Sequence, residues 1–258
     1  MKLILGILLG SLTALAQPPA NQFQIVNAAS GAASIAPGSI ASAYGMNLAP
    51  RTESATSLPL PTSLGGIGFQ AVDSTGKSTA VSLIYVSPTQ INFVAPADLG
   101  TGTITFHIIN GTGVVPSGMA MVAGVAPGIF AANGSGKGVA LATAIRTVIP
   151  SNIQTPIPVF QCDDKAACVS VPIELGIDTP IYLSLYGTGF RNRSSLSNVS
   201  VSINGMNVSV LYAGPQPDFP GLDQINVPVV LGLRGAGETD VVVTVDGQVA
   251  NTVRINVK

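Results

Sequence analysis

The 258-residue sequence contains no tryptophan, one histidine, two cysteines and few charged residues. A single imidazole, His107, cannot supply the two further protein ligands that a four-coordinate zinc site would need beside the cysteine pair. A Ser–His–Asp triad would have to use the same histidine, and no G-x-S-x-G elbow is present. Only 9% of residues are charged and none form a basic run, which removes the footprint expected of nucleic-acid binding. We therefore predict no enzyme activity, no cofactor, no metal and no nucleic-acid partner.

Glycine and proline are abundant, with 29 and 19 copies, and Val, Ser, Thr and Asn fill much of the remainder. Such a composition is typical of strands built from β-branched residues and joined by Gly, Pro and Asn turns. No stretch after the first residues shows a sustained helical period of apolar residues. The composition therefore predicts an all-β protein.

The first sixteen residues have the pattern of an export signal. Lys2 precedes an apolar run from Leu3 to Leu15, and Ala14-Leu15-Ala16 is a cleavage signal that places the mature start at Gln17. The run is shorter than the ~20 apolar residues of a membrane span, although a retained anchor is the competing interpretation. We expect bacterial export to the periplasm, the cell surface or the medium, with no membrane span after signal removal.

Three blocks of sequence occur twice in the same order. An internal repeat of domain length indicates two tandem domains and not a solenoid. The paired blocks are Tyr44-Gly45 with Tyr186-Gly187, Val81–Pro88 with Val208–Pro215 (which contain Tyr85 and Tyr212), and Gln90-Ile91-Asn92 with Gln224-Ile225-Asn226.

The repeated blocks allow two interpretations. They could form two equivalent binding sites, one in each domain. The interpretation we favour is scaffold: Gly45 and Gly187 end strands at positive φ, while Ile91 and Ile225 fill the cores. The glutamine and asparagine side chains would then satisfy backbone groups at the sheet end or face solvent.

The strand pattern is clearest in the second copy. Residues Ile181 to Tyr186 alternate between apolar and polar side chains, as do Val199 to Ile203. Asn204-Gly205 then predicts a type I′ turn into a return strand that runs from Met206 to Tyr212. In the first copy, Ser78 to Val86 is the corresponding return strand. Short strands with such turns favour a sandwich of antiparallel sheets.

Cys162 and Cys168 lie between the two copies and enclose five residues. In an exported protein, two lone cysteines this close most simply form one disulfide across a hairpin. The alternative is a reactive or metal-binding pair, but a redox C-x-x-C motif has only two intervening residues. The pair is also too close to bridge two sheets, as an antibody-type disulfide does.

Several motifs resemble known families. Tyr186-Gly187-Thr188-Gly189-Phe190, the Asn204-Gly205 hairpin and the segment from Ala236 to Val245 resemble IPT/TIG domains, which implies an immunoglobulin-like fold. Ala126–Phe130, Tyr212-Ala213-Gly214 and Gly221–Val227 are similar to an uncharacterised secreted C-terminal domain family of soil acidobacteria. The resemblance covers most of residues 120–258. It implies a fold but no mechanism, since the family has no assigned activity.

These patterns predict two immunoglobulin-like β-sandwich domains in tandem, with a small disulfide-closed β-hairpin segment between them. The expected divisions are a signal peptide at 1–16, a first domain at 17–123, a connecting segment at 124–175 and a second domain at 176–258. The sequence leaves open which domain the connecting segment packs on. Residues 172–258 are expected to contain all strands of the second sandwich.

A carboxylate pair for glycoside hydrolysis stays open, because only distance in space decides it. The candidates lie mostly in turn contexts and are expected to be solvated: Asp163, Asp164, Glu174, Asp178, Asp218, Asp223, Glu238 and Asp240.

Three functions from different classes remain. The leading hypothesis is a non-catalytic exported structural, adhesive or protein-interaction module of tandem immunoglobulin-like domains. The first alternative is a carbohydrate-binding module at the cell surface, although such platforms usually need exposed aromatic residues and this chain has only five tyrosines. The second alternative is an unrecognised secreted hydrolase.

Overall fold

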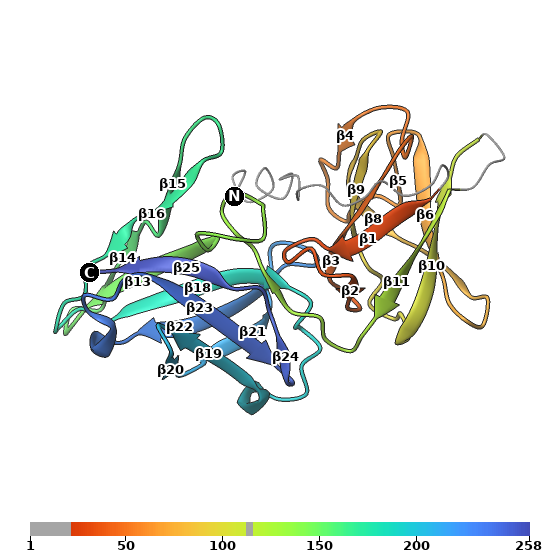
Figure 1. The fold of residues 1–258 in the computed structure, drawn as a ribbon. Helices are drawn as coiled ribbons and strands as arrows, with labels where there is room; N and C mark the ends of the chain where they lie inside the picture. Colours follow the sequence, from red (N-terminus) through yellow and green to blue (C-terminus); the bar gives the residue numbers. More distant parts are fainter. Residues whose placement is uncertain (1–21, 112–115) are drawn as a thin grey trace.

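The computed structural model describes residues 22–111 and 116–258, so the expected signal peptide and its cleavage site at Ala16 and Gln17 lie outside the described residues. Two β-sandwiches lie side by side, formed by β1–β11 and by β12–β25 (Figure 1). Two single-turn 3-10 segments, η1 (Leu196–Asn198) and η2 (Leu231–Leu233), lie in the second sandwich. The all-β prediction and the two tandem immunoglobulin-like sandwiches are confirmed.

The first sandwich consists of a five-stranded and a six-stranded sheet. The first has the order β1-β3-β9-β8-β4, with strands Phe23–Asn27, Ile40–Gly45, Gln90–Val94, Ser82–Val86 and Glu53–Ser54. The second has the order β2-β11-β10-β6-β5, with β7 beside β6. Its strands are Ser34–Ile35, Ser117–Val122, Gly102–Ile109, Ile67–Val72 and Ser63–Leu64, and β7 is Ser78–Ala80.

The second sandwich repeats this plan. One sheet has the order β14-β13-β18-β22-β21, with strands Ile153–Ile157, Ala142–Val148, Ile181–Thr188, Asp223–Val229 and Tyr212–Pro215, and β12 (Gly128–Ile129) pairs with β18. The other has the order β17-β25-β23-β19-β20, with β24 (Gln248–Val249) beside β23. Its strands are Pro172–Ile173, Val253–Val257, Gly237–Val245, Val199–Ile203 and Met206–Val208.

The two topologies correspond strand by strand. In the first sheets, β3, β9 and β8 occupy the places of β18, β22 and β21. In the second sheets, β11, β10 and β6 occupy the places of β25, β23 and β19, and each sheet has one short parallel edge pair, β2 with β11 and β17 with β25. The repeated sequence blocks therefore mark a repeated sandwich.

Much of the connecting segment belongs to the second sandwich. Strand β13 pairs with β18 over five residues, from Ala142 opposite Leu185 to Arg146 opposite Ile181, and β14 continues the sheet. Ala142 and Ala144 are buried in the second core. The second sandwich thus begins well before residue 176, and residues 172–258 do not contain all of its strands. The reason is that β13 covers the edge of β18, which would otherwise leave backbone groups unpaired.

Both predicted return strands divide between two sheets. Ser78–Ala80 pairs with β6, but the chain then crosses to the other sheet as β8. In the second copy, β20 ends at Val208, and Tyr212 begins β21 in the opposite sheet. The prediction of one continuous strand to Tyr212 is therefore wrong. A strand that changes sheets presents its later side chains on the other layer, which alternation along one strand cannot reveal.

The two cores are packed differently. The first contains four phenylalanines in mutual contact, with ring centroids 5.0–5.7 Å apart: Phe23, Phe69, Phe93 and Phe106. The second is mainly aliphatic, built from valine, isoleucine and leucine on alternate strand positions. Each core lies between two sheets, as expected for a sandwich. The hairpin turns at Asn204-Gly205 and Asp246-Gly247 have positive φ at both residues, as type I′ turns require.

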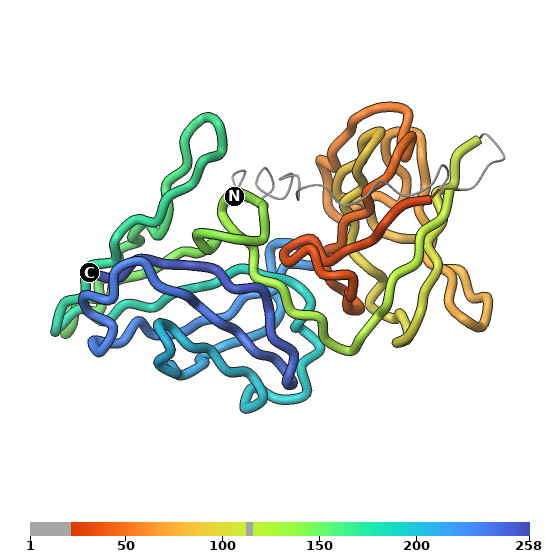
Figure 2. The backbone as a smooth tube through the Cα atoms, viewed as in Figure 1, coloured from red at the N-terminus to blue at the C-terminus, as the bar shows by residue number. Residues whose placement is uncertain are grey.

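A third apolar cluster joins the two sandwiches. Its buried members come from both domains: Ala29, Ile40, Ile84, Phe130, Leu141 and Leu222. The backbone passes between the sandwiches along the segment before β12 (Figure 2). Buried polar contacts accompany the cluster: Asn27 Nδ2 donates to the Ala126 carbonyl at 2.8 Å, and the Ile40 amide donates to Thr188 Oγ1 at 2.7 Å. The junction is therefore packed in the manner of a core and fixes one domain on the other.

Candidate functional site

The repeated blocks of the first domain meet on the outer face of one sheet. Ser42 on β3 lies opposite Asn92 on β9, and Tyr44 lies opposite Gln90. On the other side of β9, Tyr85 of β8 lies opposite Asn92. Residues opposite one another in a sheet share a face, so the three blocks form one surface.

The second domain builds the same arrangement. Ser184 and Tyr186 of β18 lie opposite Asn226 and Gln224 of β22, and Tyr212 of β21 lies opposite Asn226. The correspondence is residue for residue with the first domain. It depends on the sheet change described above, because only that crossing brings Tyr85 and Tyr212 beside β9 and β22.

Side-chain hydrogen bonds connect the polar members of each set. Gln90 Nε2 donates to Asn92 Oδ1 at 2.8 Å, and Gln224 Nε2 donates to Asn226 Oδ1 at 2.7 Å. Ser42 Oγ also donates to Asn92 Oδ1, at 2.9 Å. The amides therefore bond to one another on the outer face, whereas the sequence suggested that they satisfy backbone groups or face solvent.

The repeated glycines have a different role from the one expected. Gly45 and Gly187 do not have positive φ, so that prediction is wrong. A Cβ at Gly187 would instead overlap the Gly128 carbonyl and the Phe190 ring, and one at Gly45 would overlap Leu48 and Phe23. These glycines permit close approach of neighbouring chain segments.

The repeated isoleucines lie beneath the polar face. Ile91 and Ile225 are both 0% exposed and belong to the first and second cores. Each follows the glutamine and precedes the asparagine of its block, so alternation along the strand separates a polar outer face from an apolar inner one.

All five tyrosines of the chain lie on these two outer faces. Four are the repeated residues, and the fifth, Tyr182, lies on β18 at the position that Ile40 occupies in the first domain. We call the outer face of the sheet β14-β13-β18-β22-β21 the tyrosine face. The register and burial of its strands place on it Thr143, Ile145, Pro156, Tyr182, Ser184, Tyr186, Tyr212, Gly214, Gln224, Asn226 and Pro228.

The two copies differ in exposure. In the first domain Ser42 and Asn92 are 2% and 1% exposed, and Ile40 and Ile84 pack in the junction cluster. On the tyrosine face, Tyr182 and Tyr212 are 41% and 38% exposed. Packing at the junction therefore covers more of the first copy than of the second, and it leaves Tyr44 and Tyr85 half-buried.

The tyrosines of the open copy are held by specific contacts. Tyr212 Oη donates to the Pro215 carbonyl at 2.6 Å, and the hydroxyl lies above Gly214, where a Cβ would touch it. Tyr186 Oη and Thr143 Oγ1 are 3.1 Å apart and hydrogen-bonded. Tyr186 also packs against the junction cluster. The rings of Tyr186 and Tyr212 are therefore positioned before any ligand arrives.

The tyrosine face carries no charge on its strand positions, since its residues are tyrosines, amides, hydroxyls, prolines, an isoleucine and a glycine. Such groups stack on a ligand and hydrogen-bond to it, and the strand positions of the face carry neither a carboxylate nor an imidazole, the groups that most often transfer protons in catalysis. The arrangement is suited to holding a ligand and poorly suited to general acid–base chemistry.

A buried ion pair fixes the loop at one end of this sheet. Asp223 is 0% exposed and accepts hydrogen bonds from the amides of Phe190 and Arg191 at 2.9 and 3.1 Å and from Arg191 Nε at 2.9 Å. Burial raises the pKa of Asp223, against the opposing charge of Arg191. The expectation that Asp223 is solvated is wrong, because the loop after β18 folds over the start of β22. The other seven acidic candidates are exposed.

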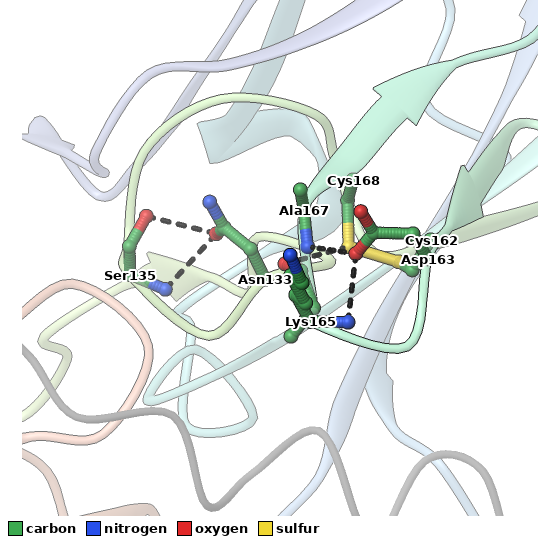
Figure 3. Close-up of a disulfide and its surroundings, with 8 residues drawn as sticks. Asn133, Ser135, Cys162, Asp163, Lys165, Ala167 and Cys168 are labelled. Carbon is green, nitrogen blue, oxygen red and sulfur yellow. Dashed lines mark hydrogen bonds between the residues drawn. A yellow bond between two sulfur atoms is a disulfide. The ribbon is translucent and has the colours of Figure 1, made fainter.

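The disulfide between Cys162 and Cys168 is confirmed and joins β15 (Phe160–Cys162) to β16 (Cys168–Ser170). The hairpin projects from the second sandwich (Figure 1). Asp163 Oδ1 accepts from the amides of Lys165 and Ala167 at 2.9 and 2.8 Å, which organises the loop that the disulfide closes (Figure 3). The disulfide and these hydrogen bonds stabilise the turn of the hairpin.

The remaining candidate catalytic and metal-binding side chains do not come together in a site. His107 lies on the outer face of β10 with Thr103 and Thr105, on the first domain. A shallow polar depression in the second domain contains Ser194 and Asp246, where hydrogen bonds from Ser194 lower the pKa of Asp246. A carboxylate with a lowered pKa is a weak base and does not activate the serine. Across the described residues, His, Cys, Asp and Glu side chains form no group that could hold a metal ion.

The repeated blocks identified Tyr186, Tyr212, Gln224 and Asn226 of the tyrosine face, but they did not indicate that Tyr182, Pro228 and the residues of β13 and β14, such as Thr143, belong to it. The available signal was the polar side of the strand from Ile181 to Tyr186, which carries Tyr182, Ser184 and Tyr186 in alternation. Thr143 had no such signal, since pairing of β13 with β18 comes from the tertiary structure.

No protein-family model matches the chain, and no curated protein matches it. Among solved structures, it is similar to SGBP-B of the Bacteroides ovatus mixed-linkage glucan utilization locus, determined in complex with a mixed-linkage heptasaccharide. The identity is 12%, the TM-score is 0.36, and the match covers 95% of this chain and 47% of the other, so this chain spans about half of that protein. Bovine butyrophilin matches with 9% identity and a TM-score of 0.25, over 87% of this chain and 94% of the other. Likenesses this distant carry no argument about function. Within the described residues, no helix is long and apolar enough to cross a membrane.

Proposed function

We propose that this protein is a non-catalytic exported binding module, in which two fixed immunoglobulin-like sandwiches present the tyrosine face of the second domain to a partner at a cell surface. The observation that carries the proposal is the difference between the two copies of the repeated face. In the first copy the serine and the two amides are buried and Tyr44 and Tyr85 are half-buried, whereas the second copy exposes two tyrosine rings on a face whose strand positions carry no charged residue. Exposed, organised aromatic residues are typical of recognition surfaces.

The junction supports a role in presenting this face. The apolar cluster and the hydrogen bonds of Asn27 and Thr188 hold the domains in one arrangement. A fixed arrangement lowers the ordering entropy that a flexible linker would add to binding. The first domain then acts as a support for the open face.

Export rests on the signal pattern at residues 1–16 and is supported by the disulfide, since such bonds persist in oxidising compartments. Membership of the acidobacterial secreted family is likewise part of the proposal, based on the motifs between Ala126 and Val245.

A carbohydrate-binding module is the specific form that one observation favours. Tyr182 and Tyr212 supply the exposed rings that sugar-binding sheets use, and amides lie between them. An adhesive contact with a protein is the competing form, and Ile145, at 37% exposed, is the residue that best suits it.

The proposal is tested with the mature chain, from Gln17, fixed to beads. Binding to cell-envelope preparations and to protein and glycan arrays is compared between the natural chain and a Tyr182→Ala/Tyr212→Ala double variant. We expect binding to at least one of these surfaces, with a loss in the double variant. Binding of equal strength in both would contradict the proposed face. Turnover in ester, glycoside or peptide assays would contradict the non-catalytic role.

A further inference from the structure

The geometry of the tyrosine face points to one ligand class: we infer that it binds an uncharged polysaccharide chain laid across the strands, with Tyr182 and Tyr212 as separate stacking positions. This inference rests on the proposed function, because it assigns a ligand to the same face.

The two exposed rings lie on different strands and in different rows. Tyr182 shares a row with Ile145 and Pro228, whereas Tyr212 shares the next row with Asn226 and Ser184. Strands ~4.8 Å apart and a rise of ~3.4 Å per residue place their Cα atoms about 12 Å apart, on a diagonal across β22. A single small ring cannot contact both positions, so the face suits an extended, repeating ligand.

The groups along this diagonal match the chemistry of a sugar chain. A pyranose presents C–H groups on its ring faces and hydroxyls around its edge, and a tyrosine ring packs on the first while amides bond to the second. Asn226 lies between the tyrosines and receives Gln224 Nε2 on its Oδ1 at 2.7 Å. Among the described residues no partner occupies Asn226 Nδ2, which leaves a fixed donor beside the path.

Charge selects against other polymers. The strand positions of the face carry no charged residue, and the guanidinium of Arg193, from the loop after β18, reaches the end of the face, where its Nη1 lies 3.4 Å from the Cβ position of Gly214. A polycation would lose hydration on this surface without gaining an opposite charge, and a polyanion would find, in the part of the chain that the structure describes, only the single cation of Arg193 at one end. The ligand that fits has hydroxyls in place of charges.

The first domain is not expected to offer a second site. Ile40 stands where the second domain has Tyr182, and it is 2% exposed in the junction cluster. Asn92, the counterpart of Asn226, is 1% exposed. The duplicated face should therefore give one binding site per chain.

The experiment uses the mature full chain in native affinity gels and in titration calorimetry. Hydroxyethylcellulose, galactomannan and arabinoxylan are the uncharged probes, and carboxymethylcellulose is the anionic partner of the first. We expect at least one uncharged polymer to retard the protein in the gel. Calorimetry with a soluble oligosaccharide of that polymer should give one site per chain. If the cellulose backbone is the ligand, carboxymethylcellulose should bind more weakly than hydroxyethylcellulose.

Matched variants locate the site. Tyr182→Ala and Tyr212→Ala should each weaken binding about tenfold, as truncation of a central aromatic contact does. Tyr182→Phe should restore most of what Tyr182→Ala loses, because it keeps the ring. Met119→Ala, on the outer face of the first domain and 68% exposed, is the control for a distant exposed residue and should bind as the natural chain does. Thermal melts of all variants establish that they fold.

The outcomes separate this inference from the proposed function. If no uncharged polymer binds, but the alanine variants lose binding to a protein on the arrays, the ligand class is wrong and the binding face stands. If a polymer binds equally to all variants, both the ligand path and the face are wrong. Two binding sites per chain would contradict the inference that the repeated face of the first domain does not bind the ligand.

Discussion

Asp223 gives the sharpest test of how the second domain is held together. The Asp223→Ala variant removes the acceptor of two backbone amides and of Arg191 Nε, all inside a site where the carboxylate is 0% exposed. Removing one partner of a buried ion pair lowers the free energy of unfolding by about 3–5 kcal/mol, because the two amides and Arg191 Nε lose their acceptor and the guanidinium keeps, among the residues that the structure describes, only the Leu222 carbonyl. We expect a loss in this range.

The destabilisation caused by Asp223→Ala should extend beyond the immediate surroundings of the carboxylate. The loop that Asp223 holds contains Thr188 and Asn192, and their side chains bond to Ile40 and to the Pro37 carbonyl of the first domain. The variant should therefore loosen the domain junction as well as the second sandwich.

Urea unfolding followed by circular dichroism measures the effect, with calorimetry to separate the two domains, since a two-domain chain need not unfold in one step. Asp240→Ala is the matched control, because Asp240 and Arg254 form a similar pair at 3.0 Å with side chains 56% and 55% exposed. An exposed pair contributes at most about 1 kcal/mol. Equal midpoints for Asp223→Ala and Asp240→Ala would refute the reasoning.

The protonation of Asp223 gives this prediction a pH dependence. Burial raises the pKa of Asp223 above the ordinary value of 3.8 that it regains on unfolding. The folded state then binds the proton more tightly, so this contribution to stability is complete below the unfolded pKa and is lost as the pH rises through the folded pKa. Melts at a series of pH values should show the natural chain losing stability relative to Asp223→Asn over that window. The opposite trend would mean that Arg191 outweighs burial.

The remaining predictions concern close packing, domain limits and the disulfide. Gly187→Ala should lower the free energy of unfolding by about 1–3 kcal/mol through overpacking, whereas Gly100→Ala, which has open space at its Cβ, should change it little in the same urea melts. A fragment of residues 123–258 should give a cooperative β-type thermal transition, and one of residues 172–258, which lacks β13, should not; equal transitions would show that β13 is dispensable. Thiol labelling of the natural chain should detect no free cysteine before reduction, and two labelled thiols in the native state would contradict the disulfide.

The sequence by itself determined the class of fold, because its signals are local. Alternation in the strand from Ile181 to Tyr186 reports which side faces a core, and Asn204-Gly205 reports a turn whose positive φ few other residues adopt. The repeated blocks determined that this fold occurs twice. Cysteine spacing was sufficient for the disulfide, since two residues on a short hairpin have no other partner within the chain.

Tertiary structure alone decided which surface is available. Tyr85 and Tyr212 follow equivalent sequences, but one lies against the domain junction and the other is 38% exposed on an open face. No local pattern distinguishes them, because the difference comes from how two whole sandwiches pack. The sheet change before each tyrosine and the pairing of β13 with β18 likewise depend on contacts between distant segments. The close approach of Gly128 to Gly187 explains a glycine that the sequence suggested to end a strand at positive φ. Local backbone preferences depend on neighbouring residues in the sequence. The exposure of a side chain depends on every segment that packs around it, including segments distant in the sequence.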